Sequence, residues 1–374
     1  MDYIQNCLYL SLFYYSIIIS YFNLSLFNLK YKKKHINKFV SVIIAVKNGE
    51  KSLPGLLQSL IEQTYKNNIE FIIVDDESID GSLKIIKNYI NKDNRIITTS
   101  SINGDNLLSH KKKALDAGIK IAKGEILLFS DVDCILPKDW VFNTLNCFSN
   151  ETDYIIGYSE VPKSFNLVTL FQKIDFFMLM NATHASINKN LYWACSGQNQ
   201  AYKKSIYIKN NGFNTISKFL QGDDTLFLQL CNKNLKKFKA NFSFNKLNKV
   251  YCRKETNIKS FLLQRIRWAG DATNSLIFSK SLFIMSVATF FTNFILLLNL
   301  FLYIFQIISV YELIIPLFIK FLVDFSFALK GMKVHHDQYS VLEFLFWFLL
   351  QPIYILIIGI GSFFQNHMRW KGIK

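Results

Sequence analysis

Three long apolar runs without a single charged residue constrain this chain most. They cover residues 3–29, 281–311 and 344–366, with lengths of 27, 31 and 23 residues. A helix needs roughly 20 apolar residues to cross a hydrocarbon layer about 30 Å thick, so each run is long enough for one span. Buried core helices of soluble proteins are rarely so long and so free of charge. The sequence therefore predicts membrane spans near both ends of the chain, with a more polar part between them.

The first apolar run can also be interpreted as a cleaved secretory signal. Against this, Met1, Asp2 and Tyr3 supply no basic residue ahead of the run, and no small-residue cleavage site follows it. A cluster of lysines follows instead, namely Lys30, Lys32, Lys33, Lys34 and Lys38. Basic residues beside a span usually stay in the cytosol. We therefore expect an integral protein of the cytoplasmic membrane, with its N-terminus outside and a domain over residues 30–280 that faces the cytosol.

The C-terminal membrane region, residues 281–374, is predicted to contain two or three helices. The segment 313–329 is apolar but includes Lys320 and Asp324, which lie one helical turn apart. These side chains can pair inside a helix bundle, or the segment can lie on the surface. A span here places the basic tail outside, against the usual tendency; its residues are Arg369, Lys371 and Lys374. Apolar length favours the span, and with it four spans in total, the first within residues 1–29.

Composition excludes several classes of protein. The chain has a net charge of +16, from 43 Lys and Arg against 27 Asp and Glu. Lysines beside the membrane account for part of this charge through contact with anionic lipids, and no nucleic-acid recognition module is present, so nucleic acid is not an expected partner. Six scattered cysteines without a C-x-x-C pair indicate reduced thiols. An apolar content of 51% excludes a disordered tail.

The middle of the chain alternates short apolar runs with helical patterns. Predicted strands cover residues 39–46, 71–74 and 126–129, and predicted helices cover 53–61, 82–90 and 111–122. This alternation is typical of an α/β sheet with parallel strands and right-handed crossovers. Ligands of such sheets bind beyond the carboxyl ends of the strands. The residues that follow each strand are therefore the first candidates for a functional site.

Acidic residues follow two of these strands. Asp75 and Asp76 come after the second strand, and Asp131 and Asp133 come after the third, about 55 residues later. The carboxylates would repel one another at one edge of the sheet unless a cation lies among them. Mg²⁺ and Mn²⁺ prefer carboxylate oxygens and share their other positions with water and phosphates. A D-x-D sequence alone is common by chance, so its place at the end of a buried strand is the informative feature.

Several segments, in order, resemble the family 2 glycosyltransferases of the GT-A fold. FVSVIIAVKNGE, FIIVDDESIDGS and KGEILLFSDVDC resemble the nucleotide-binding half of that family. Residues 221–224 resemble its acidic pair, and residues 264–268 fit the Q-x-x-R-W signature of its membrane-bound members. The resemblance covers roughly residues 38–270. It implies a Rossmann-like, nucleotide-sugar-binding α/β domain of the GT-A type, flanked by transmembrane helices.

The resemblance also implies donor-binding residues. Those expected to bind the nucleotide sugar are Ala45, Lys47, Glu50, Asp75, Asp76, Lys111 and Asp131. Lys111 stands where the family often has a lysine near the diphosphate, although the glycine that usually precedes it is His110 here. Asp131 and Asp133 are expected to hold Mg²⁺ or Mn²⁺ on the diphosphate.

The catalytic and acceptor-binding residues lie later in the chain. Asp224 is the expected catalytic base, with Asp223 as its neighbour, where the family usually has Glu-Asp. A plain alternative for Asp224 is an N-cap of a helix over 225–235. Gln264, Arg267 and Trp268 are expected to contact the acceptor, or to form an amphipathic interfacial helix, or both. Residues 196–199 are expected on the acceptor side.

The function that follows is a membrane-anchored, metal-dependent inverting glycosyltransferase. It would move a sugar from a nucleoside diphosphate, UDP by resemblance, to a lipid-linked or polysaccharide acceptor. Alternatives are a processive polysaccharide synthase that works as a homo-oligomer or with a partner subunit, and a non-catalytic membrane scaffold or transporter subunit. A nucleotidyltransferase is disfavoured because the stretch after the first strand lacks a glycine-rich loop.

Overall fold

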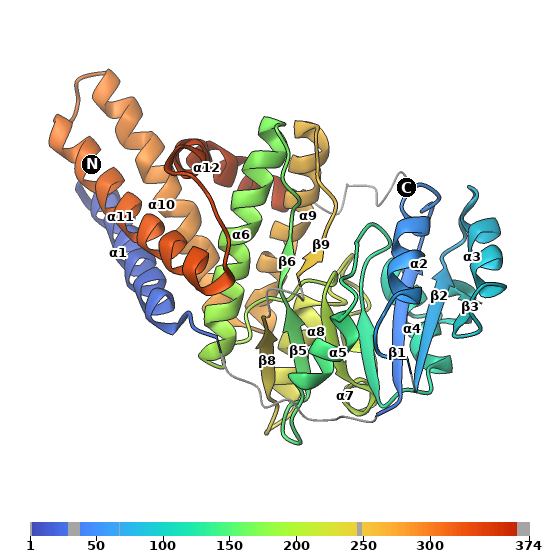
Figure 1. The fold of residues 1–374 in the computed structure, drawn as a ribbon. Coiled ribbons are helices and arrows are strands. Elements are labelled where there is room, and N and C mark those ends of the chain that lie inside the picture. The colour runs from blue at the N-terminus through green and yellow to red at the C-terminus, as the bar shows by residue number, and fades with distance from the viewer. Residues whose placement is uncertain (1, 29–37, 67, 245–248, 365–374) are drawn as a thin grey trace. The chain divides into compact units, whose positions relative to one another are not determined.

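The computed structural model describes residues 2–28, 38–66, 68–244 and 249–364. The chain forms two compact units, each built from separated stretches of sequence. The first, called the α/β unit, comprises Asn28–Pro162 and Ala194–Arg253. The second, called the helical unit, comprises Met1–Phe27, Lys163–Trp193 and Lys254–Lys374. Figure 1 shows that strands lie in the first and long helices in the second.

A seven-stranded sheet in the order β3-β2-β1-β4-β7-β5-β8 organises the α/β unit (Figure 1). Its strands are β1 (Val40–Val46), β2 (Ile69–Asp75), β3 (Ile96–Ser100), β4 (Ile126–Phe129), β5 (Tyr154–Gly157), β7 (Gln200–Lys203) and β8 (Ala240–Ser243). The four strands from β3 to β4 are parallel, and β7 is antiparallel to both of its neighbours. A second, two-stranded sheet pairs β6 (Ser159–Glu160) with β9 (Val250–Tyr251). The predicted α/β class is confirmed.

Helices cover this sheet because its central strands are buried on both faces. Every residue of β2 and β4 is buried, which explains why these strands read as unbroken apolar runs. The helices of the unit are α2 (Leu53–Ile61), α3 (Ser82–Ile90), α4 (His110–Ile121), α5 (Trp140–Asn146), α7 (Lys204–Lys209) and α8 (Thr225–Asn234). The predicted strands and helices are thus confirmed to within two residues at each end.

The loops after β1 and β2 are joined by hydrogen bonds. The backbone N–H of Asn48 donates to Ser78 Oγ over 3.0 Å, and that of Ile79 donates back to Asn48 Oδ1 over 2.9 Å. The N–H of Gly49 donates to Ser82 Oγ over 2.9 Å. Neighbouring parallel strands end at the same edge of the sheet, so these bonds fix the backbone where ligands of such sheets bind.

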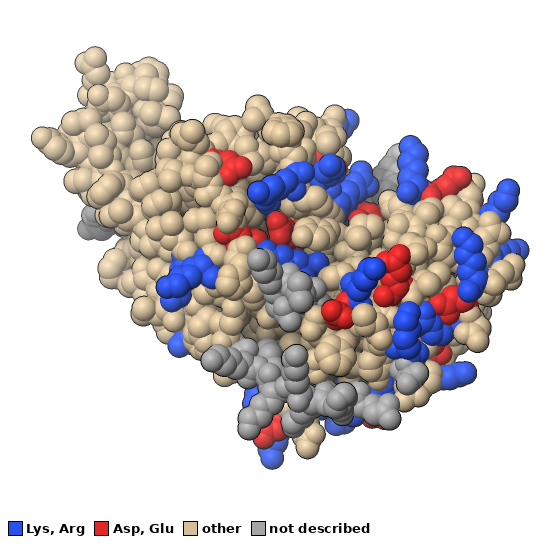
Figure 2. Space-filling model, in the orientation of Figure 1, with Lys and Arg blue, Asp and Glu red and all other residues tan. Residues whose placement is uncertain are grey.

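Six long helices lie within the described part of the helical unit. They are α1 (Asp2–Ser25), α6 (Leu167–Asn188), α9 (Ile258–Asn274), α10 (Lys280–Ile304), α11 (Val310–His335) and α12 (Val341–Ser362). Among the described residues, α10 and α12 are long and apolar enough to cross a membrane. Only 33% of the most apolar window of each is buried inside the protein. In Figure 2 the surface around α10 and α11 carries almost no charged side chains.

The predicted spans correspond to helices, with differences. The runs 281–311 and 344–366 lie largely in α10 and α12, while α1 and α11, which hold the other two predicted segments, are not among the candidate spans found within the described residues. The soluble domain expected over 30–280 would include α6 and α9, which here group with the helical unit. Lys30, Lys32, Lys33 and Lys34 and the basic tail at 369–374 lie outside the described residues. The number of spans and the domain division stay predictions.

Lys320 and Asp324 pair inside the helical unit. Both side chains are fully buried, and Lys320 Nζ lies 2.6 Å from Asp324 Oδ2. Tyr15 of α1 donates to Asp324 Oδ1 over 2.7 Å, and Lys320 donates to Gln351 of α12. Of the two arrangements open from sequence, the structure has the bundle pairing. This buried cluster, the α11 ion pair, connects α1, α11 and α12.

The described cysteines are unbridged, as the composition predicts. Cys134, Cys147, Cys195, Cys231 and Cys252 are all buried and free.

Candidate functional site

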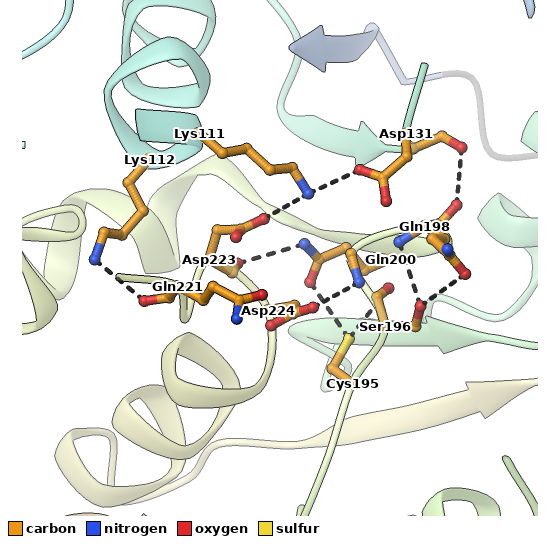
Figure 3. Close-up of polar contacts among 12 residues, drawn as sticks. Lys111, Lys112, Asp131, Cys195, Ser196, Gln198, Gln200, Gln221, Asp223 and Asp224 are labelled. Atoms are coloured by element: carbon orange, nitrogen blue, oxygen red, sulfur yellow. Dashed lines mark hydrogen bonds and ion pairs between the residues drawn. The ribbon is translucent and has the colours of Figure 1, made fainter. Parts of the chain in front are cut away.

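Lys111 lies between two carboxylates from distant parts of the sequence. It is the second residue of α4, and its Nζ is 2.8 Å from Asp131 Oδ1 and 2.9 Å from Asp223 Oδ2 (Figure 3). Asp131 follows β4 and Asp223 precedes α8, so one ammonium group connects three elements of the α/β unit. Burial alone would lower the pKa of Lys111, but the carboxylates of Asp131, Asp223 and Asp224 outweigh it and hold the pKa well above its usual value.

Asp224 is held by two backbone N–H groups. It is the N-cap of α8, with Thr225 N donating to Oδ1 over 2.6 Å and Gly197 N donating to Oδ2 over 2.9 Å. The N-cap role left open by the sequence is therefore present. Burial and the negative charge of Asp223 raise the pKa of Asp224 to about 6, against the lowering effect of Lys111 and of these hydrogen bonds. A carboxylate of this pKa is ionised at neutral pH and still basic enough to accept a proton.

Gly197 brings the backbone close to these charged groups. A Cβ atom at this position would lie 2.9 Å from Lys111 Nζ and 3.3 Å from carboxylate oxygens of both Asp223 and Asp224. Any larger residue must displace at least one of them. Sequence reasoning assigned residues 196–199 to the acceptor side but did not detect this contact.

The segment before β7 is fixed on both sides. Ser130 Oγ donates to the carbonyl of Gln198 over 2.8 Å, which ties the segment to the end of β4. Thr225 Oγ1 donates to the carbonyl of Cys195 over 3.0 Å, which ties it to the start of α8. The residue before Asp131 and the residue after Asp224 are thus anchored to the same short stretch.

The residues expected to bind the nucleotide lie where β1 and β2 end. Lys47 Nζ is 3.5 Å from Asp76 Oδ2. Asp75 Oδ2 accepts from Ser78 N over 3.3 Å, whereas Asp75 Oδ1 is buried without a hydrogen-bond partner among the described residues. Such an oxygen carries a desolvation cost that a donor group on a ligand would remove.

Two other donor-side residues have local roles. Ala45 lies within β1, in register with Val74 of β2. Glu50 Oε2 accepts from the backbone N–H of Gly81 over 3.1 Å, so this carboxylate supports the loop after β2. The structure leaves their roles toward a nucleotide as predictions.

The donor set around Asp131 suits a divalent cation in part. Within the described ranges, no three or more His, Cys, Asp or Glu side chains are grouped so that they alone could hold a metal. Asp131 and Asp133 nonetheless supply hard oxygen atoms next to one strand end, and Mg²⁺ commonly takes one or two carboxylates and completes its shell with water and substrate phosphates. The residues present fit an ion that arrives with a diphosphate.

His110 has a backbone conformation that normally favours glycine. Its φ is 54°, in the left-handed region, at the first residue of α4. The family to which this chain is similar often has glycine here, and the backbone gives the physical reason. The departure noted from sequence therefore places a residue with a strained backbone next to Lys111.

The Q-x-x-R-W segment lies on α9, in the helical unit. The Trp268 ring packs against Phe176 with centroids 5.8 Å apart, and Gln264 and Arg267 are half-buried. The buried cation of this segment is Arg265, which sequence reasoning passed over. Arg265 Nε lies 2.9 Å from Asp175 Oδ2, and its guanidinium lies 4.2 Å from the Trp268 ring centre. Trp268 is thus stacked on a buried ion pair, and its contact with an acceptor stays a prediction.

Residues 41–210 match the sequence model of glycosyl transferase family 2. Over these residues, which make up less than half of the chain, the sequence is similar to that family. The match begins within β1 and ends after α7, so this family 2 region includes Lys111, Asp131 and Gly197. The predicted resemblance to the family is confirmed over these residues, whereas the motifs at 221–224 and 264–268 lie beyond the match.

Curated relatives of the chain are glycosyltransferases. The chain is 35% identical over 135 residues to the poly(ribitol-phosphate) β-glucosyltransferase of Bacillus spizizenii, a match to 33% of this chain and 20% of that protein. It is 29% identical over 201 residues to UDP-Glc:α-D-GlcNAc-diphosphoundecaprenol β-1,3-glucosyltransferase WfaP of Escherichia coli, a match to 53% of this chain and 72% of that protein. The chain thus spans only about a fifth of the length of the Bacillus relative.

A solved structure shares the fold over nearly the whole chain. Mannosyltransferase PcManGT from Pyrobaculum calidifontis, in complex with GDP-Man and Mn²⁺, superposes with a TM-score of 0.60 over 98% of each chain. The sequences are 13% identical, so the likeness concerns the fold alone. The predicted GT-A architecture is confirmed.

Proposed function

We propose that this protein is a membrane-anchored glycosyltransferase that moves a sugar from a nucleoside-diphosphate sugar to a lipid-linked or glycan acceptor. The observation that carries the proposal is the charged cluster of Asp131, Lys111, Asp223 and Asp224, in which three carboxylates surround one ammonium. Similarity to family 2 and the GT-A fold support the reaction class.

The charged cluster contains groups that could act on the leaving diphosphate and on the attacking acceptor hydroxyl. The acceptor oxygen forms a bond to the anomeric carbon while the bond from that carbon to the diphosphate oxygen breaks, and the electron pair of that bond leaves with the diphosphate. A single displacement of this kind inverts the anomeric centre. Lys111 supplies positive charge where the diphosphate would gain negative charge. Asp131 and Asp133 would hold Mg²⁺ or Mn²⁺, which when bound supplies further positive charge to the leaving group.

Asp224 is the proposed general base. It would accept the proton of the acceptor hydroxyl. The two backbone N–H groups that donate hydrogen bonds to its carboxylate fix that carboxylate in one orientation. Asp223 keeps the pKa of Asp224 high through its negative charge. A base with a pKa of about 6 can both exist in its ionised form at pH 7 and take up a proton during the reaction.

Binding of the donor is assigned to the edge formed by β1 and β2. The partly unsatisfied Asp75 carboxylate is suited to accept hydrogen bonds from a base or ribose, and Asp76 and Lys47 lie beside it. The names of similar proteins support a nucleotide-sugar donor, since WfaP uses UDP-Glc and PcManGT was solved with GDP-Man. We assign UDP as the nucleotide by the motif resemblance.

Anchoring through α10 and α12 would hold the site near its acceptor. Their outward apolar faces suit a bilayer, and the acceptor named for WfaP is a diphosphoundecaprenol lipid. We place the catalytic domain on the cytosolic side of the cytoplasmic membrane, with Gln264, Arg267 and Trp268 toward the acceptor. A processive reaction would require an oligomer or a partner subunit to complete a channel.

The test is transfer by membranes that contain the protein. Membranes are incubated with labelled UDP- and GDP-sugars, with Mn²⁺, with Mg²⁺ or with EDTA, and lipid and polymer products are separated. Asp224→Asn keeps the N-cap and Asp131→Asn keeps the size of the side chain, so both should fold and lose transfer. Glu151→Gln, at an exposed ion pair with Lys239, is the control. Full activity of Asp224→Asn would exclude it as the base, and absence of transfer from every donor would overturn the proposed reaction.

A further inference from the structure

Lys112 is a buried lysine one residue beyond Lys111. Its side chain is 1% exposed, and it leaves α4 in a different direction from that of Lys111 (Figure 3). Its ammonium donates to the backbone carbonyls of Ile216 over 2.7 Å, Gln221 over 3.1 Å and Ser217 over 3.3 Å, and also to that of Phe219. One buried cation thus collects four carbonyl oxygens from a six-residue stretch, which we call the carbonyl cage.

Burying the ammonium group of Lys112 in the carbonyl cage costs more free energy than filling the same space with an apolar side chain. Moving an ammonium group out of water is unfavourable, and apolar residues of similar volume often stabilise a protein more than buried charges do. Four carbonyl dipoles that converge on one point would also repel one another without a cation. Stability alone therefore does not explain the carbonyl cage. We expect instead that the backbone path of residues 216–221 is fixed because a neighbouring part of the protein depends on it.

That reason lies directly after the cage. Gln221 is two residues before Asp223, and the intervening Gly222 has a φ of 109°, a conformation that other residues rarely adopt. The chain therefore turns sharply between the last caged carbonyl and the acidic pair. Any shift of the cage would move Asp223 away from Lys111 and Asp224 away from Gly197.

We propose that Lys112 is a positioning residue that sets the acidic pair Asp223-Asp224 for the transfer reaction. Consecutive lysines of α4 then hold the same segment twice: Lys111 binds the side chain of Asp223, and Lys112 binds the backbone that leads to it. This inference rests on the proposed function for its effect on rate, while the structural role of the cage stands on its own contacts.

Chemical rescue tests the role of the ammonium. Lys112→Ala removes the cation and leaves a channel of about the width of the side chain, and we expect kcat to fall about 100-fold, as a misplacement of about 1 Å can cause. The KM for the nucleotide sugar should stay within about threefold, since misplacement acts on the reacting groups and leaves the pocket at β1 and β2 in place. Added n-propylammonium, which matches the Cγ-to-Nζ fragment that the substitution removes, should restore rate, whereas n-propanol, of similar size and without charge, should not. Lys112→Met, which fills the space, should be slow and resist rescue.

A second measurement keeps the cage testable without enzymatic activity. Amide hydrogen exchange over residues 214–224 should speed up in Lys112→Ala and slow again with n-propylammonium, while exchange in β4 stays unchanged. Lys113→Ala, which removes a half-buried lysine whose ammonium donates to Asn106 Oδ1 over 3.3 Å, is the matched control and should behave as wild type. An active Lys112→Ala with wild-type kcat and exchange would overturn the proposal. If wild type transfers no sugar, the proposed function fails, and exchange alone then decides whether Lys112 holds the segment.

Discussion

At the scale of single residues, the pKa of Asp224 predicts how activity depends on pH. The carboxylate must be ionised to accept a proton, and its pKa is raised to about 6 by burial and by Asp223. kcat/KM should therefore be level above pH 7 and fall about tenfold per pH unit well below pH 6. Asp223→Asn removes a negative neighbour, so the acidic limb should move to lower pH. A profile whose limb stays in place in this variant would contradict the coupling.

Gly197 carries a second prediction at this scale. In Gly197→Ala the new methyl group would press on Lys111 and on both acidic side chains, so we expect kcat to fall about 100-fold with little loss of thermal stability. Steady-state kinetics and a melting curve measure the two effects. Gly55→Ala in the exposed part of α2 is the control, because alanine favours a helix by up to about 1 kcal/mol. Wild-type kinetics of Gly197→Ala would show that the three charged groups need not stay where they are.

At the scale of elements, the first residue of α4 carries strain that glycine would relieve. His110 has a φ of 54°, which costs a residue with a Cβ about 1 kcal/mol or more. His110→Gly should therefore leave the free energy of unfolding unchanged or raise it. Lys113→Gly, inside the same helix at ordinary helical φ, should lower it by about 1 kcal/mol. Denaturant titration compares the two variants, and equal destabilisation by both would contradict the role of the backbone at residue 110.

Elements of the α/β unit differed in how well the sequence predicts them. β1, β2 and β4 are buried on both faces, so each reads as an apolar run, and the helices between them show helical periodicity. β8 is a four-residue strand that includes polar side chains, so no apolar pattern marks it beforehand. α6 buries many polar residues, so its sequence does not indicate that it groups with the helical unit.

The candidate site also has a part that the sequence predicts and a part that it does not. Carboxylates that directly follow strands are visible in the sequence because the edge of a parallel sheet brings them together. The contact of Lys111 with Asp223 joins residues more than a hundred positions apart, and the carbonyl cage of Lys112 uses backbone atoms that have no sequence signature. Such contacts depend on the path of the chain between elements, and only the folded structure reveals them.

At the scale of the whole molecule, the α11 ion pair is predicted to hold the helical unit together. Lys320 and Asp324 are completely buried, and Tyr15 and Gln351 join them from α1 and α12. Removing one partner leaves the other charge buried without compensation, which typically costs about 3–5 kcal/mol. Lys320→Met should therefore lower thermal stability in detergent strongly, and the double variant Lys320→Met with Asp324→Leu should recover much of the loss.

How much of the melting temperature the double variant recovers tells whether the charge pair or apolar packing stabilises the helical unit. If α1, α11 and α12 depend on the charge pair itself, the double variant would melt as low as the single one. If apolar packing carries the bundle, with rings such as Phe348 close to Lys320, removal of both charges should be nearly neutral. We expect the second result, because the pair is surrounded by aromatic side chains that an apolar residue can contact equally well. Lys330→Met, exposed on the same helix, controls for loss of a lysine and should leave the melting temperature unchanged.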